Sequence, residues 1–382
     1  MCASQEALGQ HFVGWHGGTL PFEAAVDLPP DIAQRFVEVE GGVVMATFST
    51  FNDGVYTLPA AAEDDVRLRQ AIEDHSGVDD PLPSGGSSLQ EFTDHKKRVW
   101  RRSNRLLGSG AFGEVYLGMG IGGDLVALKT MKLVKPAEPN SPLSQASSGS
   151  QTSTWGADAN VEEVLREVSL LSELRDENIV GYIGSVVVHG TLVIIIEYIP
   201  GGSLASVLKE FNALALGATQ RYVRDIVRGL AFLHKNDVIH RDVKPHNVLL
   251  MIDGQCKLTD FGASAKLGQL QSESEKKKVQ GTPLYMAPEQ CMGNVCKASD
   301  VWGVGILTYQ LLTGSMPFSE ELLTNYNPYM FMYRLGREET FVPTLGEALK
   351  SPVAREFCES ILKRDPARRP TADDLLSHPF LL

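Results

Sequence analysis

The sequence predicts an α+β protein in which a short β-rich segment precedes a larger region of strands followed mainly by helices. Two patterns in the larger region support this prediction. Apolar stretches with the length and composition of strands lie in its first half, at 106–117, 125–131 and 192–196. Apolar residues recur at helical spacing at 160–174, 219–235 and 300–313.

The first segment, residues 1–95, differs from the rest of the chain in charge. It carries 16 acidic and three basic residues, whereas residues 96–382 carry 31 acidic and 32 basic ones. The net charge of −12 therefore comes from this segment. Since neither part has a large basic excess, we expect no nucleic-acid partner. The acidic segment is expected to bind a basic partner or to restrain the region that follows, the alternative being that its charge only favours solubility.

A small β-rich part is expected within this segment, at 36–58. Its turn signals, Gly41-Gly42 and Asn52-Asp53-Gly54, separate three expected strands, at 36–40, 43–50 and 55–58. The segment is too short to form a hydrophobic core of its own. We therefore expect these three strands to pack on a neighbouring part of the chain or to be partly disordered. Pro, Gly, Ser and Asp then dominate 75–90, which predicts a linker at 75–95 and a second domain at 96–382.

Composition narrows the class of protein further. The longest aliphatic stretch, 192–196, is too short to span a bilayer. The five cysteines are scattered, and Cys291 and Cys296 have no second Cys or His pair near them at zinc spacing. We therefore expect a cytoplasmic protein with reduced cysteines and no membrane span. Residues 136–160, with three prolines, six serines and no basic residue, predict a disordered insertion.

Two short strings in the second half carry the strongest chemical signal. The string HRDVKPHN occupies 240–247, and Asp260 opens the string DFG thirteen residues later. Phosphoryl transfer needs a carboxylate near the attacking hydroxyl, a cation near the moving phosphate and oxygen ligands for Mg²⁺. Asp242, Lys244, Asn247 and Asp260 supply these groups at short spacing.

A glycine-rich stretch, GSGAFG at 108–113, lies upstream and fits two kinds of nucleotide site. The dinucleotide-binding version would open a helix, as in an oxidoreductase. Here the residues from Val115 onward continue as a strand and lead to VALK at 126–129. The pattern therefore favours a hairpin whose backbone N–H groups approach phosphates.

Together these strings resemble the signature set of the eukaryotic protein kinases, over residues 100–382. The resemblance implies the bilobal kinase fold: an N-lobe at 96–200 with a small antiparallel sheet and one helix, and a mainly helical C-lobe at 201–382. It also implies ATP and Mg²⁺ as cofactors and a protein as phosphate acceptor. Because no signature residue is missing, a catalytically silent scaffold is the less favoured alternative.

The resemblance assigns roles to single residues. Asp242 would orient the substrate hydroxyl, Lys244 would neutralise the γ-phosphate, and Asn247 and Asp260 would bind Mg²⁺. Lys129 would hold the α- and β-phosphates and pair with Glu167, with Glu163 as a competing partner. Ile196 would guard the rear of the adenine pocket. The positions implied to contact ATP are Leu107, Gly108, Ser109, Gly110, Ala111, Phe112, Gly113, Val115, Ala127, Lys129, Glu197, Ile199 and Leu249.

Further strings indicate the kinase class. Lys244 with Thr282 is the serine/threonine pattern. The strings WRR at 100–102, EYIPGGS at 197–203 and DFGASAK at 260–266 resemble the mitogen-activated protein kinase kinase kinases. That resemblance implies a MAP kinase kinase as the protein substrate.

Structural and regulatory roles also follow from the resemblance. Asp300 would anchor the catalytic loop, Arg369 would pair with Glu289, and His240 would be a packed structural residue. Arg241 would bind a phosphate on the activation segment, added by an upstream kinase. Lys278 stands where relatives carry a phosphorylatable hydroxyl, which leaves two nearby acceptors, Ser272 and Ser274. The alternative is a constitutive enzyme in which Lys278 pairs with Glu273 or Glu275.

Overall fold

A computed structural model describes the chain at residues 19–20, 36–39, 42–45, 91–110, 113–132, 168–188, 190–267 and 279–382. These residues fall in two units, 1–70 and 71–382. Among the described residues, no helix combines the length and apolar character needed to cross a membrane.

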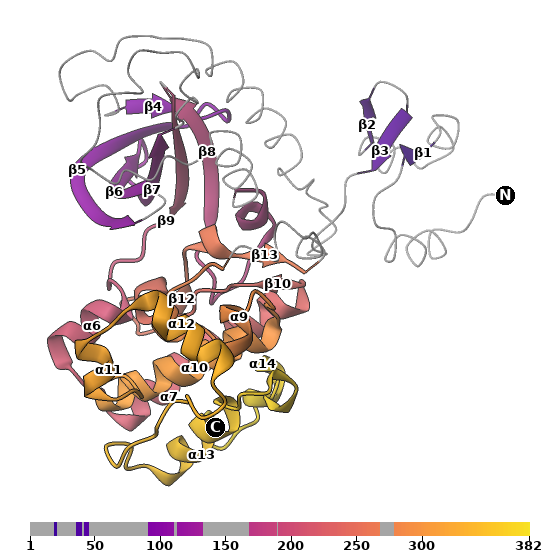
Figure 1. Ribbon diagram of the computed structural model, residues 1–382. Coiled ribbons are helices and arrows are strands. Elements are labelled where there is room, and N and C mark those ends of the chain that lie inside the picture. Colours follow the sequence, from indigo (N-terminus) through magenta and orange to yellow (C-terminus); the bar gives the residue numbers. More distant parts are fainter. Residues whose placement is uncertain are drawn as a thin grey trace, which may run out of the picture. The chain divides into compact units, whose positions relative to one another are not determined.

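The first unit contains a three-stranded antiparallel sheet (Figure 1). Its strands are β1 (Thr19–Leu20), β2 (Phe36–Val39) and β3 (Gly42–Met45), in the order β1-β3-β2. The hairpin of β2 and β3 confirms the first two strands predicted at 36–50, although β3 ends earlier. The predicted third strand at 55–58 lies outside the described residues, and β1 is the strand paired to the other edge of β3.

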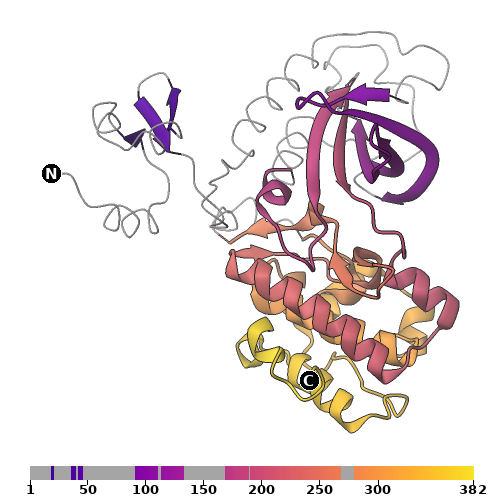
Figure 2. The same ribbon diagram turned by 180° about the vertical axis from the view of Figure 1, so that it is seen from behind.

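The second unit begins with a six-stranded antiparallel sheet in the order β4-β5-β6-β7-β9-β8. The strands are β4 (Glu91–Thr93), β5 (Val99–Gly110), β6 (Gly113–Gly120), β7 (Leu125–Lys132), β8 (Tyr182–Val188) and β9 (Thr191–Glu197). Figure 2 shows this sheet above the helical part of the unit. The strands expected at 125–131 and 192–196 are thus confirmed as β7 and β9.

The hairpin predicted from the glycine-rich stretch 108–113 is confirmed, whereas the apolar stretch 106–117, predicted as one strand, is the end of β5 and the beginning of β6. The two strands form a hairpin in which Gly110 pairs with Gly113. Gly113 has φ +123°, and a Cβ there would lie 2.1 Å from the carbonyl oxygen of Thr130 on β7. Only glycine fits this position, so the glycine pattern reverses the chain inside the apolar stretch.

The sheet also includes residues that the sequence assigned to the linker 75–95. Strand β4 pairs with β5 through Glu91↔Arg101, Phe92↔Trp100 and Thr93↔Val99. Phe92 is buried and its two neighbours are exposed. The prediction failed here because a strand of three residues has too little sequence to show alternation.

Immediately after β4, the buried carboxylate of Asp94 accepts hydrogen bonds from three residues of the β4–β5 hairpin, Lys96, Arg98 and Trp100. Its Oδ1 accepts from the backbone N–H groups of Lys96 and Arg98, at 2.9 Å each. Its Oδ2 accepts from Nε of Arg98 at 2.7 Å and from Nε1 of Trp100 at 3.0 Å. Burial raises the pKa of Asp94, but the hydrogen bonds from Trp100 and Arg98 outweigh it, so the pKa lies below its usual value.

We expect Asp94→Ala to lower the free energy of unfolding by about 2–4 kcal/mol, because it removes the acceptor of the buried indole N–H of Trp100 and of Nε of Arg98. Urea denaturation at pH 7 measures the change. Since the native pKa is depressed, the carboxylate stabilises the fold at neutral pH, and this contribution is lost as the pH falls below about 4. The wild-type and Asp94→Ala stabilities should therefore converge at low pH; a constant difference would contradict the assignment.

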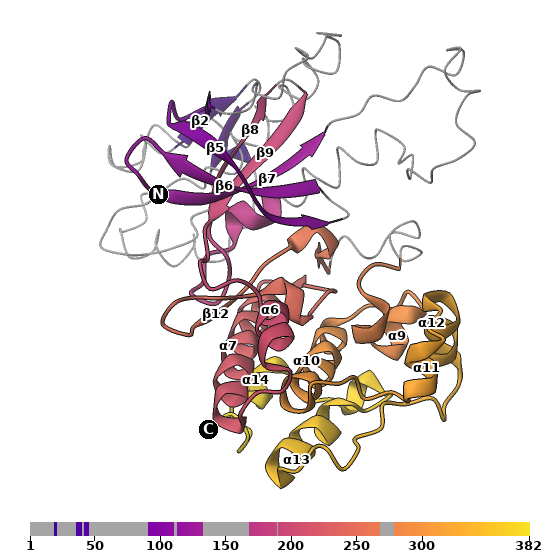
Figure 3. The same ribbon diagram turned by 90° about the vertical axis from the view of Figure 1, so that its left-hand side faces the viewer.

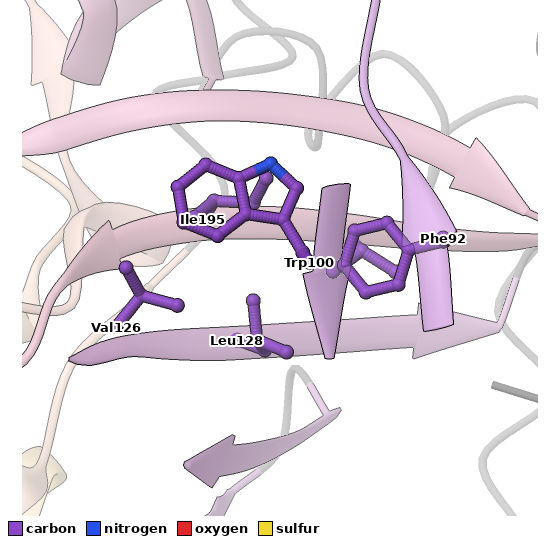
Figure 4. Packing of buried hydrophobic residues seen from close by; sticks show 6 residues of the cluster. Phe92, Trp100, Val126, Leu128 and Ile195 are labelled. Atoms are coloured by element: carbon purple, nitrogen blue, oxygen red, sulfur yellow. The ribbon is translucent and has the colours of Figure 1, made fainter. Parts of the chain in front are cut away.

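The inner face of the sheet forms a compact apolar core. Figure 4 shows Trp100 between Phe92 and the aliphatic side chains of Val126, Leu128 and Ile195. Residues 168–173 form the described part of the helix predicted at 160–174, and its apolar residues Val168, Leu170 and Leu171 are buried. Residues 160–167 of the predicted helix, with Glu163 and Glu167, and the insertion 136–160 lie outside the described residues, and residue 174 is described but is not helical.

The C-lobe is mainly helical, as Figure 3 shows from the side. Its helices are α6 (Leu204–Phe211), α7 (Leu216–Lys235), α9 (Pro288–Cys291), α10 (Lys297–Thr313), α11 (Glu320–Thr324), α12 (Pro328–Arg337), α13 (Pro352–Ile361) and α14 (Ala372–Leu375). The helices predicted at 219–235 and 300–313 are confirmed as α7 and α10. Helix α10 is buried on nearly all sides, and α7 and α13 contact it.

Two short antiparallel strand pairs lie at the top of the C-lobe and frame the loops described below. Strand β10 (Val238–Ile239) pairs with β13 (Ala265–Lys266), and β11 (Val248–Leu250) pairs with β12 (Cys256–Leu258). The loop 240–247 therefore has a strand at each end. The DFG string follows β12 directly.

Candidate active site

The loop 240–247 is held by one buried carboxylate on α10. Asp300 accepts from the backbone N–H of His240 at 2.9 Å and from that of Arg241 at 2.7 Å. It also lies 2.8 Å from Nε2 of His234 on α7. These bonds hold Arg241 at φ 66°, a left-handed conformation that is uncommon for a residue with a side chain. The anchoring role predicted for Asp300 is confirmed.

Asp242 stands at the centre of a cluster of hydrogen-bond donors. Its Oδ2 accepts from Nζ of Lys244 at 2.6 Å and from Nδ2 of Asn247 at 3.0 Å. Its Oδ1 accepts from the backbone N–H of Thr282 at 2.9 Å. The structure therefore brings together Asp242, Lys244 and Asn247, and adds the backbone of Thr282.

Lys244 connects this loop to Thr282, near the C-terminal end of the activation segment, residues 260–289. Its Nζ donates to Oγ1 of Thr282 at 2.7 Å while it also contacts Asp242. Thr282 directly precedes the short helix η5 (Pro283–Tyr285). The two residues used in the sequence to indicate the serine/threonine class are thus in direct contact beside Asp242.

Lys129 and Asp260 form an ion pair between the two lobes. Nζ of Lys129, on β7, lies 3.1 Å from Oδ1 of Asp260, two residues after the end of β12. Burial raises the pKa of Asp260, but the charge and hydrogen bond of Lys129 outweigh it and hold the pKa below its usual value. Asp260 is therefore ionised at neutral pH. The predicted partner of Lys129, Glu167, lies outside the described residues.

The side-chain oxygens of Asn247 and Asp260 are suitable ligands for a divalent cation such as Mg²⁺. Nδ2 of Asn247 donates to the backbone oxygen of Asp242 at 2.9 Å as well as to its carboxylate, so its amide oxygen is the atom left for a ligand role. Asp260 contributes an ionised carboxylate. Mg²⁺ is usually bound through one or two such groups together with phosphate oxygens and water.

The described positions predicted to contact a nucleotide lie on the six-stranded sheet, at its connection to the C-lobe and on β11. Leu107, Gly108, Ser109 and Gly110 end β5, and Gly113 and Val115 begin β6. Val115 pairs with Lys129 across the sheet, and Ala127 pairs with Ile196. Ala127, Ile196 and Ile199 are buried, and Leu249 lies half-buried on β11. Ala111 and Phe112, at the tip of the hairpin, lie outside the described residues.

Glu197, the last residue of β9, makes contacts that the sequence did not predict. Its Oε2 accepts from the backbone N–H of Gly181 and from Nζ of Lys257 on β12, at 3.0 Å each. This carboxylate therefore ties the connection between the lobes to both of them. No local signal pairs positions 197 and 257, because the contact depends on how the lobes come together.

Glu289 and Arg369 form a bidentate ion pair in the C-lobe, as predicted. Nη1 and Nη2 of Arg369 lie 2.7 and 2.8 Å from the two oxygens of Glu289. The Arg369 side chain has no exposed area, and its Nε donates to the backbone oxygen of Lys363. This pair joins α9 to the segment before α14.

Two further residues of the catalytic loop had predicted roles, His240 and Arg241. His240 is fully buried, with Nε2 3.1 Å from the backbone oxygen of Thr259, as expected of a packed residue. The guanidinium of Arg241 donates to the backbone oxygens of Ala263 and Ser264. The segment proposed to carry the phosphate for Arg241, with Ser272, Ser274 and Lys278, lies outside the described residues.

Comparison with known proteins agrees with this geometry. The family model described as "Protein kinase domain" matches residues 101–381. The chain is 36% identical over 285 residues to the Arabidopsis thaliana protein named "Mitogen-activated protein kinase kinase kinase 3", which covers 74% of this chain and 40% of that relative. It is 31% identical over 326 residues to "Mitogen-activated protein kinase kinase kinase 19" of Mus musculus, covering 83% of this chain and 23% of the relative.

A third relative is the Dictyostelium discoideum protein named "Mitogen-activated protein kinase kinase kinase A". It is 33% identical over 301 residues, which is 77% of this chain and 29% of the relative. The chain thus spans two fifths or less of the length of these three curated relatives.

Proposed function

Because this chain belongs to the protein kinase family, we propose that it transfers the γ-phosphate of ATP to serine or threonine hydroxyls of a protein. The observation that carries the proposal is the contact set of Asp242, which joins Lys244, Asn247 and Thr282 within hydrogen-bond distance. The pair of Lys129 and Asp260 brings a cation and a carboxylate from the two lobes to the same region.

In this mechanism Asp242 orients the acceptor hydroxyl and takes its proton as the oxygen attacks the γ-phosphorus and the bond to the leaving β-phosphate oxygen breaks. Lys244, next to Asp242, neutralises charge on the transferred phosphate. Lys129 binds the α- and β-phosphates, and Glu167 is its proposed second partner. These charges are fixed in place before the reaction, which is how such sites stabilise a transition state.

Asn247 and Asp260 are the proposed ligands for Mg²⁺. When bound, the cation neutralises phosphate charge. The adenosine part of ATP is proposed to lie against Val115, Ala127 and Leu249, with backbone groups of Glu197 and Ile199 toward adenine. The glycine-rich hairpin 107–113 would cover the phosphates.

The relatives' names support a narrower proposal about the substrate. We assign the chain to the mitogen-activated protein kinase kinase kinase tier, with a MAP kinase kinase as protein substrate and the cytoplasm as its location. An upstream kinase acting on Ser272 or Ser274 remains part of this proposal. The contact of Lys244 with Thr282 is consistent with an acceptor hydroxyl of serine or threonine.

The purified chain with radiolabelled ATP and a peptide library tests this function. Phosphoserine and phosphothreonine are the expected products, because the proposed position of the acceptor hydroxyl, close to Asp242, favours the short side chains of Ser and Thr. Inactivated MAP kinase kinases serve as protein substrates in the same assay. Phosphotyrosine as the main product would contradict the assigned class, and no transfer to any substrate would contradict the enzyme assignment.

A further inference from the structure

A cavity of the C-lobe lies between the end of α7, the beginning of α10 and the segment that leads into α14. It has a volume of about 820 Å³, which is enough for a small molecule. None of the described residues that line it is assigned above to the nucleotide, the cation or the acceptor hydroxyl. The apolar part of its lining consists of Leu267, Ala298, Val301, Pro366, Pro370 and Ala372.

The imidazole of His234 also lines this cavity, although the residue is only 7% exposed. Its Nε2 lies 2.8 Å from Oδ2 of Asp300, an oxygen that also accepts from the backbone N–H of His240. Because a carboxylate oxygen is the acceptor in this contact, Nε2 carries the proton. In the neutral ring, Nδ1 is then an acceptor with a free lone pair.

No described residue forms a hydrogen bond with Nδ1 of His234. This nitrogen is not fully enclosed either, since it is absent from the described buried atoms that lack a partner, and its side chain borders the cavity. Polar atoms in such surroundings are usually hydrogen-bonded, and leaving one without a partner costs free energy. The cavity therefore combines apolar walls with one acceptor that a ligand can satisfy.

The charged residues of the lining leave little net charge for an ionic ligand. Arg369 is held in the buried ion pair described above, and Nζ of Lys297 lies 2.7 Å from Oδ1 of Asp237. Lys235 and Asp373, the other two charged residues of the lining, are exposed and of opposite sign. An electrically neutral ligand matches this distribution better than an anion or a cation.

We propose that this cavity binds a neutral, mainly apolar ring compound that donates an N–H or O–H hydrogen bond to Nδ1 of His234. The apolar body of the ligand covers the walls, and the single polar contact fixes its orientation, as in most small-molecule sites. Because the same ring supports Asp300, the ligand would also favour the tautomer that the catalytic-loop anchor needs. The inference goes beyond the proposed function and does not depend on it.

Two isomeric probes of equal size, 3-methylindole and 1-methylindole, test the polar contact, because only the first has an N–H. Isothermal titration calorimetry of the purified chain gives the Kd of each probe at mildly alkaline pH, which favours neutral imidazole. A non-hydrolysable ATP analogue and Mg²⁺ are present to occupy the proposed nucleotide site. We expect a Kd for 3-methylindole about tenfold lower than for 1-methylindole, the effect of one hydrogen bond. Equal Kd values, or no saturable binding, would overturn the proposal.

The variant His234→Gln removes Nδ1 but keeps a donor for Asp300, because the amide N–H₂ of glutamine reaches close to the position of Nε2. The Kd of 3-methylindole should rise about tenfold, to that of 1-methylindole, whose own Kd should stay within about twofold. Unchanged binding of 1-methylindole shows that the cavity is intact. A Kd of 3-methylindole that does not rise contradicts the role of Nδ1. Should the variant bind neither probe, the wild-type comparison and the labelling below decide.

Cys296 lines the same cavity, so its thiol reports where the probe binds. With 3-methylindole at about ten times its Kd, N-ethylmaleimide should label Cys296 roughly tenfold more slowly, because only the unoccupied fraction reacts. Mass spectrometry of the digested chain measures this rate. Cys291 is partly exposed and lies outside this lining, so its labelling rate should not change. An unchanged rate at Cys296, or equal slowing at both cysteines, would show that the cavity is not the binding site.

Discussion

Asp242→Asn is expected to lower kcat for phosphate transfer by about 100-fold or more, with little change in affinity for nucleotide. The substitution keeps the size of the side chain but removes the charge that receives the hydroxyl proton and pairs with Lys244. Losing one such group from a preorganised site typically costs this much in the transition state. Initial rates with a peptide substrate give kcat, and binding of a fluorescent nucleotide gives the affinity.

The matched control is Asp253→Asn, which neutralises an exposed carboxylate in the turn between β11 and β12. It should leave kcat unchanged. A rate for Asp242→Asn within about threefold of wild type would contradict the assignment of Asp242.

Glu289→Ala is expected to lower the free energy of unfolding by about 3–5 kcal/mol. The change leaves the Arg369 guanidinium, which has no exposed side-chain area, without its carboxylate. Breaking a buried pair by removing one partner carries a cost of this size because the remaining charge is uncompensated. Urea denaturation, followed by circular dichroism, measures the difference.

The double variant Glu289→Ala/Arg369→Leu separates this cause from a simple loss of packing. With the cation also removed, the double variant should be more stable than Glu289→Ala alone. A double variant less stable than either single one would show that the two side chains stabilise α9 independently. Arg101→Ala, which breaks an exposed pair with Glu91, should change stability by less than about 1 kcal/mol.

The sequence predicted the parts of the structure that depend on neighbouring residues. Apolar residues at helical spacing located α7 and α10, continuous apolar stretches located β7 and β9, and the strings around Asp242 and Asp260 located the candidate site. The two wrong strand predictions have local causes. Strand β4 is too short to show alternation, and the glycines of the β5–β6 hairpin lay inside an apolar stretch that resembled one strand.

The contacts that the sequence did not predict are those between distant segments. Lys129 with Asp260 and Glu197 with Lys257 each join strands of one lobe to loops or strands of the other. Charged side chains on strands have many oppositely charged candidates along a chain, and only the packing of the lobes selects one. Resemblance to the kinases supplied Glu289 with Arg369, which spacing alone could not have paired.

Asp300 has a consequence for how this chain can drift over evolutionary time. One carboxylate serves two backbone N–H groups and the ring of His234, and none of it is exposed. Asparagine would present an amide N–H₂ to one of those donors, and glutamate would need room for a further methylene. A replacement at this position would therefore require simultaneous changes on α7 and in the loop 240–247. Among descendants of this gene, we expect positions 234 and 300 to be retained or lost together, even where the surface around them diverges.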